Sequence, residues 1–326
     1  MKSFAISLLA ASALAFNSSR SVYFTSYLAE HNKAYDTVEE FNKRFDIFMA
    51  FDAVVEAINA DERSTFKAAH NKFSDWTKEE FEKTLGLKNT INGYIQEIID
   101  DWYESDKINT QIDLPESWSW RDQGMTSPVK DQGYCGSCWA ISAIDAVESA
   151  WMIAGNSPVN FSAQQLLDCS ERNYGCTGGM FNNAYEYLKE NKTMNASDYP
   201  YTGKQGECKN DQSKGVAQVA TYDRAIGTKQ NLAQLYRQPL NVAVAAGNDA
   251  FRSYSSGILT DTSHCGQDVD HAALAVGWGE EDGVQYYIVR NSWGTKWGED
   301  GYVRIATGGV RGVCGINQFV FYPTVY

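Results

Sequence analysis

The seven cysteines of this 326-residue chain are confined to its later part, from Cys135 to Cys314. The chain before Cys135 therefore has to fold without a disulfide of its own, which predicts two parts of different character. In an oxidising compartment, an odd number of cysteines leaves one thiol unpaired, either for a bond to another molecule or for chemistry. The seven are Cys135, Cys138, Cys169, Cys176, Cys208, Cys265 and Cys314.

The first 15 residues predict entry into the secretory pathway. Lys2 is followed by a run of apolar and small residues from Phe4 to Ala15 that ends in Ala13-Leu14-Ala15. A positive start, a hydrophobic middle too short to span a bilayer and a small-x-small end are typical of a signal peptide, so we expect cleavage after Ala15. A buried N-terminal helix is the alternative. No later stretch of the sequence predicts a membrane anchor.

Composition excludes some classes of function. Hydrophobic residues make up 43% and charged residues 21% of the chain, which is usual for a folded domain. The length suits two domains, or one large domain with an appendage. The formal net charge of −13 gives no attraction to phosphate backbones or anionic lipids, so we expect no nucleic-acid partner.

Hydrophobic periodicity divides the chain into a helical segment and a mixed one. Residues 21–82 carry apolar side chains at three- and four-residue spacing with few glycines or prolines, which predicts helices. Residues 88–113 are polar and acidic and predict a linker. Further on, helices are predicted from Cys138 and near Ser162, where Ser162 and Gln165 fit a capping box. Short apolar runs predict strands at 240–246, 271–276, 286–290 and 302–305. Helices first and strands later predict an α+β domain of two lobes with a cleft between them.

Cys138 is the cysteine best placed for chemistry. It follows the turn residues of Gln132-Gly-Tyr-Cys-Gly-Ser and opens a helical pattern, so the helix N-terminus would favour a thiolate and lower the pKa of the thiol. A thiolate nucleophile needs an imidazole partner, and His271 opens a predicted strand that can aim one. Asn291 could orient that imidazole, and Trp293 could shield the bond between them. The other three histidines are His31, His70 and His264.

Other interpretations stay open on these residues alone. Cys138 could be an ordinary buried or disulfide-bonded cysteine. Cys135 and Cys138 have the C-x-x-C spacing of thiol oxidoreductases, although the βαβ pattern around such motifs is missing. A zinc site is formally possible, but paired ligand spacing is absent from the sequence. A free thiol at Cys138 would favour a peptidase, and a reversible Cys135–Cys138 bridge would favour an oxidoreductase.

Three motifs in order give a specific resemblance. Gln132-Gly-Tyr-Cys-Gly-Ser-Cys-Trp139, Asp270-His-Ala272 and Asn291-Ser-Trp-Gly294 resemble the papain/cathepsin family of cysteine peptidases. In that family, the His and Asn follow the Cys by roughly 130 to 150 residues, as they do here. The resemblance implies a papain-like α+β fold with a helical lobe, an antiparallel β-barrel-like lobe and a cleft between them. A non-catalytic relative that keeps the fold is the alternative.

The resemblance also implies a role for each residue of these motifs. Cys138 would be the nucleophile, and His271 its ion-pair partner and later general acid. Asn291 would orient His271 under the cover of Trp293, and Gln132 would bind the oxyanion together with the Cys138 backbone N–H, worth about 3 kcal/mol per donor. The implied disulfides are Cys135–Cys176, Cys169–Cys208 and Cys265–Cys314, which leaves Cys138 free.

The earlier segment resembles a cathepsin L-like propeptide. The motif residues are Glu40, Arg44, Ile47, Phe48, Val55 and Asn59, followed by Asn71, Phe73 and Asp75. Phe51 stands where the family usually has Asn, and Ala69 where it has Gly. The resemblance implies a signal peptide at 1–15, an inhibitory propeptide at 16–113 and a mature peptidase at 114–326. The propeptide would lie in the cleft and block it.

Cleft residues follow from the same resemblance. Gly178 and Gly179 would let a substrate backbone approach closely. An apolar pocket for the residue second before the cut would be lined by Met180, Phe181, Ala243, Asp270 and Phe319. The bulk of Phe319 should favour Val, Leu or Pro over Phe, unless its ring points into the core.

The resemblance further implies an endopeptidase without metal or cofactor. We expect a monomer in lysosome-like acidic vesicles or outside the cell, activated by acid as carboxylates protonate. Its expected partners are peptide and protein substrates, its own propeptide and cystatin-like inhibitors.

Overall fold

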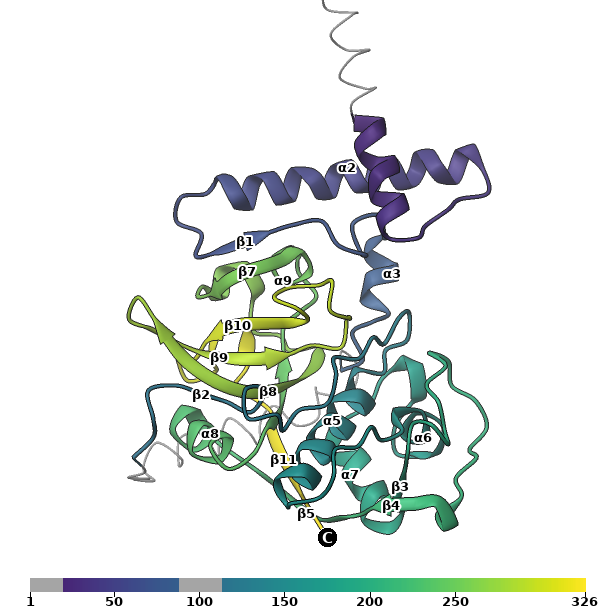
Figure 1. The fold of residues 1–326 in the computed structure, drawn as a ribbon. Helices are drawn as coiled ribbons and strands as arrows, with labels where there is room; N and C mark the ends of the chain where they lie inside the picture. Colours follow the sequence, from purple (N-terminus) through teal and green to yellow (C-terminus); the bar gives the residue numbers. More distant parts are fainter. Residues whose placement is uncertain (1–19, 88–112) are drawn as a thin grey trace, which may run out of the picture.

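The computed structural model describes residues 20–87 and 113–326. The predicted cleavage after Ala15 and the predicted linker, except for Asp113, lie outside these residues. A strand-rich lobe and a helical lobe stand side by side, and an N-terminal module, residues 20–87, crosses over the strand-rich lobe (Figure 1). The predicted α+β fold with two lobes is confirmed.

The helical lobe is built around one buried helix. Helix α5 (Cys138–Ile153) begins at the predicted residue and is buried along almost its whole length. It packs on α6 (Ala163–Cys169), on α7 (Phe181–Glu190) and on the sheet. The short elements near it are η2 (Gly175–Thr177), β3 (Thr193–Met194), η3 (Gln212–Lys214) and β4 (Gly215–Ala217).

The capping box predicted at α6 forms only in part. The Ser162 hydroxyl accepts a hydrogen bond from the Gln165 backbone N–H at 3.0 Å. The Gln165 side chain does not return the bond, because it donates to the Lys192 carbonyl and accepts from the Met194 N–H instead. The Ser162 N–H donates to the Met194 carbonyl. Strand β3 thus supplies the partners that the box would have supplied.

The strand-rich lobe contains a nine-stranded sheet in the order β1-β7-β10-β9-β8-β6-β11-β5, with β2 beside β8. The order has two ends, so the strands form an open sheet and not a closed barrel, and the β10–β7 pair is parallel. The four predicted strands are present as β6, β8, β9 and β10. The bounds are β1 (Phe66–Ala68), β2 (Trp118–Ser119), β5 (Val219–Arg224), β6 (Leu240–Val244), β7 (Tyr254–Leu259), β8 (His271–Glu281), β9 (Val284–Arg290), β10 (Tyr302–Ala306) and β11 (Val320–Val325). Short helices join them: α8 (Gly227–Leu235), α9 (Asp249–Ser253), α10 (Thr262–Cys265) and η4 (Val313–Gly315).

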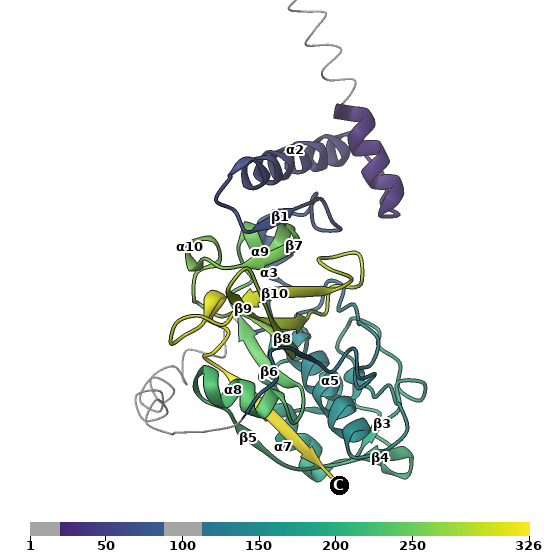
Figure 2. The same cartoon turned by 60° about the vertical axis from the view of Figure 1, so that its left-hand side comes forward.

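The sequence predicted helices throughout the N-terminal module, but the structure shows that only part of it is helical. It has helices at residues 20–30, α2 (Val38–Ala60) and α3 (Lys78–Glu82), but β1 is a strand that pairs with β7. Figure 2 shows α2 lying above β1 and β7. The Asn59 side chain holds β1 in place, since it donates to the Ala68 carbonyl at 2.8 Å and accepts from the Ala68 N–H at 2.9 Å. Non-local partners therefore override the local helical pattern.

The two departures from the propeptide motif are accommodated. Phe51 is buried in a small cluster with Val55 and Ala68, and the Arg252 guanidinium lies 5.0 Å from its ring centroid. Ala69 does not need a glycine-type backbone, and its N–H donates to the Ser253 carbonyl at 2.8 Å.

Charged side chains join α2 to α3. Arg44 of α2 contacts Glu40 at 2.6 Å and Glu80 of α3 at 2.7 Å, and donates to the Asp75 carbonyl at 2.9 Å. The buried Asp75 carboxylate accepts from the Tyr27 hydroxyl at 2.9 Å. The carboxylate also contacts Lys33 and Tyr35. These groups fix the end of the module that leads toward Cys138.

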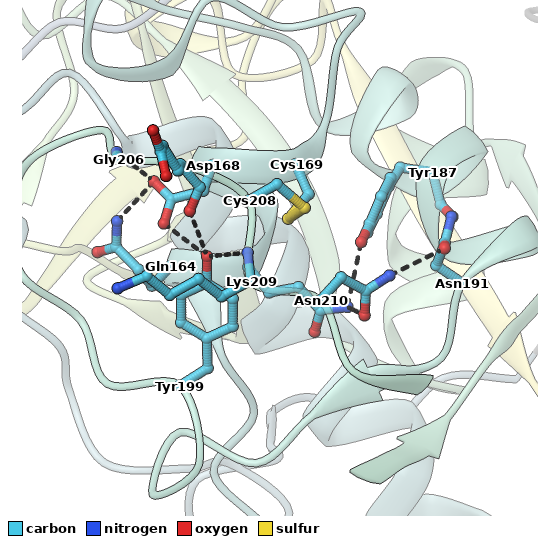
Figure 3. Close-up of a disulfide and its surroundings, with 12 residues drawn as sticks. Gln164, Asp168, Cys169, Tyr187, Asn191, Tyr199, Gly206, Cys208, Lys209 and Asn210 are labelled. Atoms are coloured by element: carbon cyan, nitrogen blue, oxygen red, sulfur yellow. Dashed lines mark hydrogen bonds between the residues drawn. A yellow bond between two sulfur atoms is a disulfide. The ribbon is translucent and has the colours of Figure 1, made fainter. Parts of the chain in front are cut away.

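Three disulfides join Cys135 to Cys176, Cys169 to Cys208 and Cys265 to Cys314, the pairs that the resemblance implies. Figure 3 shows the second, which ties α6 to the loop around Cys208. Next to it, the Asp168 carboxylate accepts hydrogen bonds from the Tyr199 hydroxyl at 2.8 Å and the Gly206 N–H at 2.7 Å. Cys138 is free and buried.

Candidate active site

The sulfur of Cys138 lies between the two lobes and the N-terminal module. Cys138 is the first residue of α5 and has no solvent exposure. Backbone groups of Trp139, Ala272 and Gly86 are close enough to the sulfur to act on the pKa of Cys138, so α5, β8 and the module all adjoin it. Ala272 directly follows His271, and the geometry therefore brings these two predicted residues to the same place.

His271 is held by Asn291 and covered by Trp293. The His271 Nε2 lies 2.7 Å from the Asn291 Oδ1, which also accepts from the Ser292 N–H at 2.7 Å. Because that oxygen is an acceptor, Nε2 carries the proton. The His271 Nδ1 then has a free lone pair, and it is buried without a hydrogen-bond partner among the described residues. The Trp293 ring lies 4.8 Å from the imidazole.

The predicted low pKa of the Cys138 thiol is not found in this conformation. Burial raises the pKa of Cys138 to about 11, although the backbone groups of Ala272, Gly86 and Trp139 act in the opposite direction. Burial also lowers the pKa of His271 to about 4, and the Asn291 hydrogen bond offsets only part of that shift. Loss of water disfavours both charged forms, so the pair is a neutral thiol and a neutral imidazole here.

Gln132 is fully buried, and all the hydrogen bonds of its side chain are used. Its Nε2 donates to the Cys135 carbonyl and to the Thr84 carbonyl of the module, both at 2.8 Å. Its Oε1 accepts from the Ser292 hydroxyl at 2.6 Å, which fixes the orientation of the amide. The sequence motif contained Ser292, but its role as the partner of Gln132 was not predicted.

Residues 84–87 of the module lie directly over Cys138. The Gly86 carbonyl accepts from the Gly179 N–H at 2.9 Å, and the Leu87 N–H donates to the Asp270 carbonyl at 2.9 Å. A Cβ on Gly86 would lie 3.0 Å from the Cys138 sulfur. The sequence analysis did not single out these residues, and a lone glycine between two leucines was the only signal.

The residues predicted to line the cleft are brought together around this segment. Gly178 has φ +133°, and a Cβ there would lie 2.4 Å from the Gly86 carbonyl oxygen. Leu87 is fully buried in one apolar cluster with the predicted pocket residues Met180, Phe181, Ala243 and Phe319. Asp270 contacts the propeptide segment through its backbone carbonyl. Its carboxylate accepts hydrogen bonds from the N–H groups of Ala246 and Gly247 and so holds the loop after β6.

Two further findings bear on the predictions. The Cys135–Cys176 bond contradicts a Cys135–Cys138 bridge and with it the oxidoreductase alternative. Within residues 20–87 and 113–326, His, Cys, Asp and Glu form no cluster of three that could hold a metal ion. Over the same ranges, the helices are all too short or too polar to cross a membrane.

Comparison with protein-family models finds two matches. Residues 114–324 match the papain family cysteine protease model, and residues 24–81 match the cathepsin propeptide inhibitor domain. Similar curated proteins include the thiol protease aleurain of Arabidopsis thaliana, 38% identical over 93% of this chain and 84% of the relative. Pro-cathepsin H of Medicago truncatula is 36% identical over 94% of this chain and 87% of the relative.

Solved structures of proenzymes have the same architecture. A recombinant stem bromelain precursor superposes with a TM-score of 0.82 at 32% identity, covering 94% of this chain and 98% of that one. The digestive procathepsin L2 proteinase from Tenebrio molitor larval midgut gives a TM-score of 0.82 at 32% identity, covering 94% and 99%.

Proposed function

Because the chain belongs to the papain family of cysteine proteases, we propose that it is an endopeptidase made as an autoinhibited precursor. The inhibitory propeptide is the N-terminal module, and the mature enzyme begins near Leu114. The observation that carries this proposal is the position of residues 84–87, which lie over Cys138 and bond to the groups that a peptide substrate would use.

The arrangement suits acyl transfer. In the mature enzyme, His271 Nδ1 takes the proton of Cys138, and the sulfur attacks the scissile carbonyl. Gln132 Nε2 and the Cys138 N–H stabilise the oxyanion, each donor contributing about 3 kcal/mol. The amine leaves with the proton from His271, and a thioester remains. Water, deprotonated by His271, then releases the acid and restores the thiol.

The chain direction of the propeptide segment in the cleft explains why the enzyme does not cleave it there. In a substrate, the residue in the apolar pocket precedes the carbonyl that Gln132 binds. In the precursor, the residue at the pocket is Leu87, which follows Thr84 at Gln132. The segment thus runs opposite to a substrate. It blocks the site without presenting a carbonyl carbon in the orientation that Cys138 attacks.

The pocket favours medium-sized apolar residues. Phe319 is 2% exposed within the cluster that holds Leu87, which supports a short pocket that takes Val, Leu or Pro better than Phe. The Asp270 carboxylate is engaged by backbone N–H groups and does not offer a counter-ion for Arg.

The cellular setting is proposed from the family and the disulfides. Three disulfides support folding in the secretory pathway, with a lysosome-like vesicle or the extracellular space as destination. We expect activation by acid, a monomeric enzyme that needs no metal or cofactor, and inhibition by cystatin-like proteins that enter the same cleft.

A peptide blocked at both ends tests the proposal. The full-length precursor is incubated at acidic pH and then given an internally quenched peptide with Leu at the pocket position. Internal cleavage is expected from the wild type, and none from Cys138→Ala. Ser292→Ala, which frees the Gln132 amide, should lower kcat with little effect on KM, and Ser157→Ala, on an exposed loop, is the matched control. Cleavage by Cys138→Ala, or removal of end residues only, would contradict the proposal.

A further inference from the structure

Tyr134 is an exposed aromatic residue beside the buried site. Its side chain is 68% exposed, whereas its neighbours Gln132 and Cys135 are buried. The indole of Trp76, from the propeptide, stacks on it with ring centroids 4.2 Å apart and an interplanar angle of 8°. Trp76 itself is only 5% exposed. One face of Tyr134 is thus covered in the precursor by a residue that leaves with the propeptide.

Asp131 is the second group that the propeptide covers here. Its carboxylate pairs with Lys72 of the propeptide and accepts from the Gly133 N–H at 2.9 Å. The Lys72 ammonium is in turn largely shielded from water. Removal of the propeptide therefore uncovers an aromatic face and leaves a half-exposed carboxylate without its ammonium partner, three residues apart in one loop.

These two groups lie on the side of Cys138 away from the apolar pocket. Gln132, between them in sequence, bonds Thr84, whereas Leu87 lies at the pocket on the other side of Gly86. Asp131 also forms a backbone bridge with Trp293, which covers His271. A substrate whose upstream residue enters the pocket must carry its downstream residues across this side.

We propose that Tyr134 and Asp131 form a binding site for the part of the substrate downstream of the cut, which takes an aromatic residue on Tyr134 and a basic residue at Asp131. The inference rests on the proposed function and names its substrate class. Trp76 and Lys72 occupy the site in the precursor with that same chemistry. An aromatic pair and a partly exposed ion pair each add to binding beyond the area they bury.

Internally quenched peptides test the site in the acid-processed enzyme. All carry Leu at the pocket position. The second and third residues after the cut are varied: one of the two is Trp or Ala, the other is Lys or Glu, and both arrangements are made. We expect Trp to raise kcat/KM about 2- to 10-fold over Ala, the range of an aromatic pair. Lys should exceed Glu by about 2- to 5-fold, and this preference should fall at high salt.

Variants assign the preferences to residues. Tyr134→Ala should bring the Trp-to-Ala ratio near one, and Tyr134→Phe, which keeps the ring, should retain it. Asp131→Asn should remove the preference for Lys and keep that for Trp. Tyr326→Ala removes another exposed tyrosine, at the C-terminal end, and is the matched control.

The outcomes separate this inference from the proposed function. A short peptide that ends in a fluorogenic group directly after the cut reports the proposed function alone, so its failure would reject that function. If the wild type cleaves it but shows no gain from downstream Trp or Lys, the inference is wrong. A Trp preference that survives in Tyr134→Ala would also overturn it.

Discussion

The side-chain amide of Gln132 donates a hydrogen bond to the Thr84 carbonyl at 2.8 Å. The same nitrogen donates to the Cys135 carbonyl, so both of its N–H groups are in use. If Gln132 binds the oxyanion, its amide has no N–H left for a substrate in the precursor. Inhibition would then be direct occupation of the reacting position, and it should depend on a few atoms of residues 84–87.

Gly86→Ala tests this close approach. An added Cβ would lie 2.2 Å from the Gly136 carbonyl oxygen, so the segment has to move away from the cleft. We expect the propeptide segment to dock more weakly in the cleft, by about 1–3 kcal/mol. An epoxysuccinyl peptide should then label Cys138 of the precursor faster at neutral pH. Gly308→Ala, where a Cβ meets nothing within 4 Å, is the control. Equal labelling rates in the two variants would refute close packing over Cys138.

Glu80 should make the propeptide sensitive to acid. Its hydrogen bond with Arg44 lowers the pKa of Glu80 below the usual 4.5. A lowered pKa stabilises the fold above the unfolded value, and the stabilisation is lost as the pH falls through the folded value. Because the side chain is partly exposed, the effect is about 1 kcal/mol or less.

Thermal unfolding of inactive Cys138→Ala precursors measures this effect. Adding Glu80→Gln should lower Tm at pH 7, and the difference from the parent should shrink toward pH 3. Glu39→Gln, on the exposed side of α2, should change little at either pH. A difference between parent and Glu80→Gln that is independent of pH would count against the ionised pair.

Asp145 should be essential for joining the lobes. It lies in α5, and its carboxylate is 2.6 Å from Lys130 and 2.6 Å from Arg290 at the end of β9. The side chains of Asp145 and Arg290 are both buried. Asp145→Asn therefore leaves a buried positive charge uncompensated, at a cost of about 3–5 kcal/mol. In a Cys138→Ala background, Tm should fall by about 6–15 °C. Asp223→Asn, on an exposed strand position, serves as the control, and an equal Tm in both variants would exclude a joining role.

Phe319 should limit the size of the apolar pocket. Peptides with Val or Leu at the pocket position should be cleaved about 10-fold better than peptides with Phe, measured as kcat/KM. Phe319→Ala should reverse or remove this difference, and Phe319→Leu should reduce it partly. Comparable wild-type turnover of Phe and Leu peptides would mean that the Phe319 ring does not bound the pocket.

Local patterns predicted much of the fold. The start of α5 at Cys138 and strands β8 to β10 follow from turn residues and apolar runs that the sequence displays directly. Strand β1 was missed because its partners, β7 and Asn59, are supplied by distant or neighbouring elements and not by its own three residues.

The site divides in the same way. The roles assigned to Cys138, His271 and Asn291 came from motifs, and the structure places His271 against Asn291 and its neighbour Ala272 beside Cys138. The path of residues 84–87 was not predicted, because a short irregular segment held by another surface has no periodicity of its own. The thiol pKa was expected to be low from the helix N-terminus, but the sequence does not reveal the burial that reverses the shift.

The rate of Cys138 alkylation as a function of pH tests the central claim most directly. Iodoacetamide is applied to the precursor and to the processed enzyme, and mass spectrometry follows the modified Cys138 peptide. We predict that the processed enzyme reacts well below pH 7 with a rate that levels off there, because removal of residues 84–87 rehydrates the thiolate beside His271. The precursor should stay unreactive until the pH approaches about 11. Equal rates in both forms, or a processed enzyme that titrates like an ordinary thiol near pH 8.5, would contradict it.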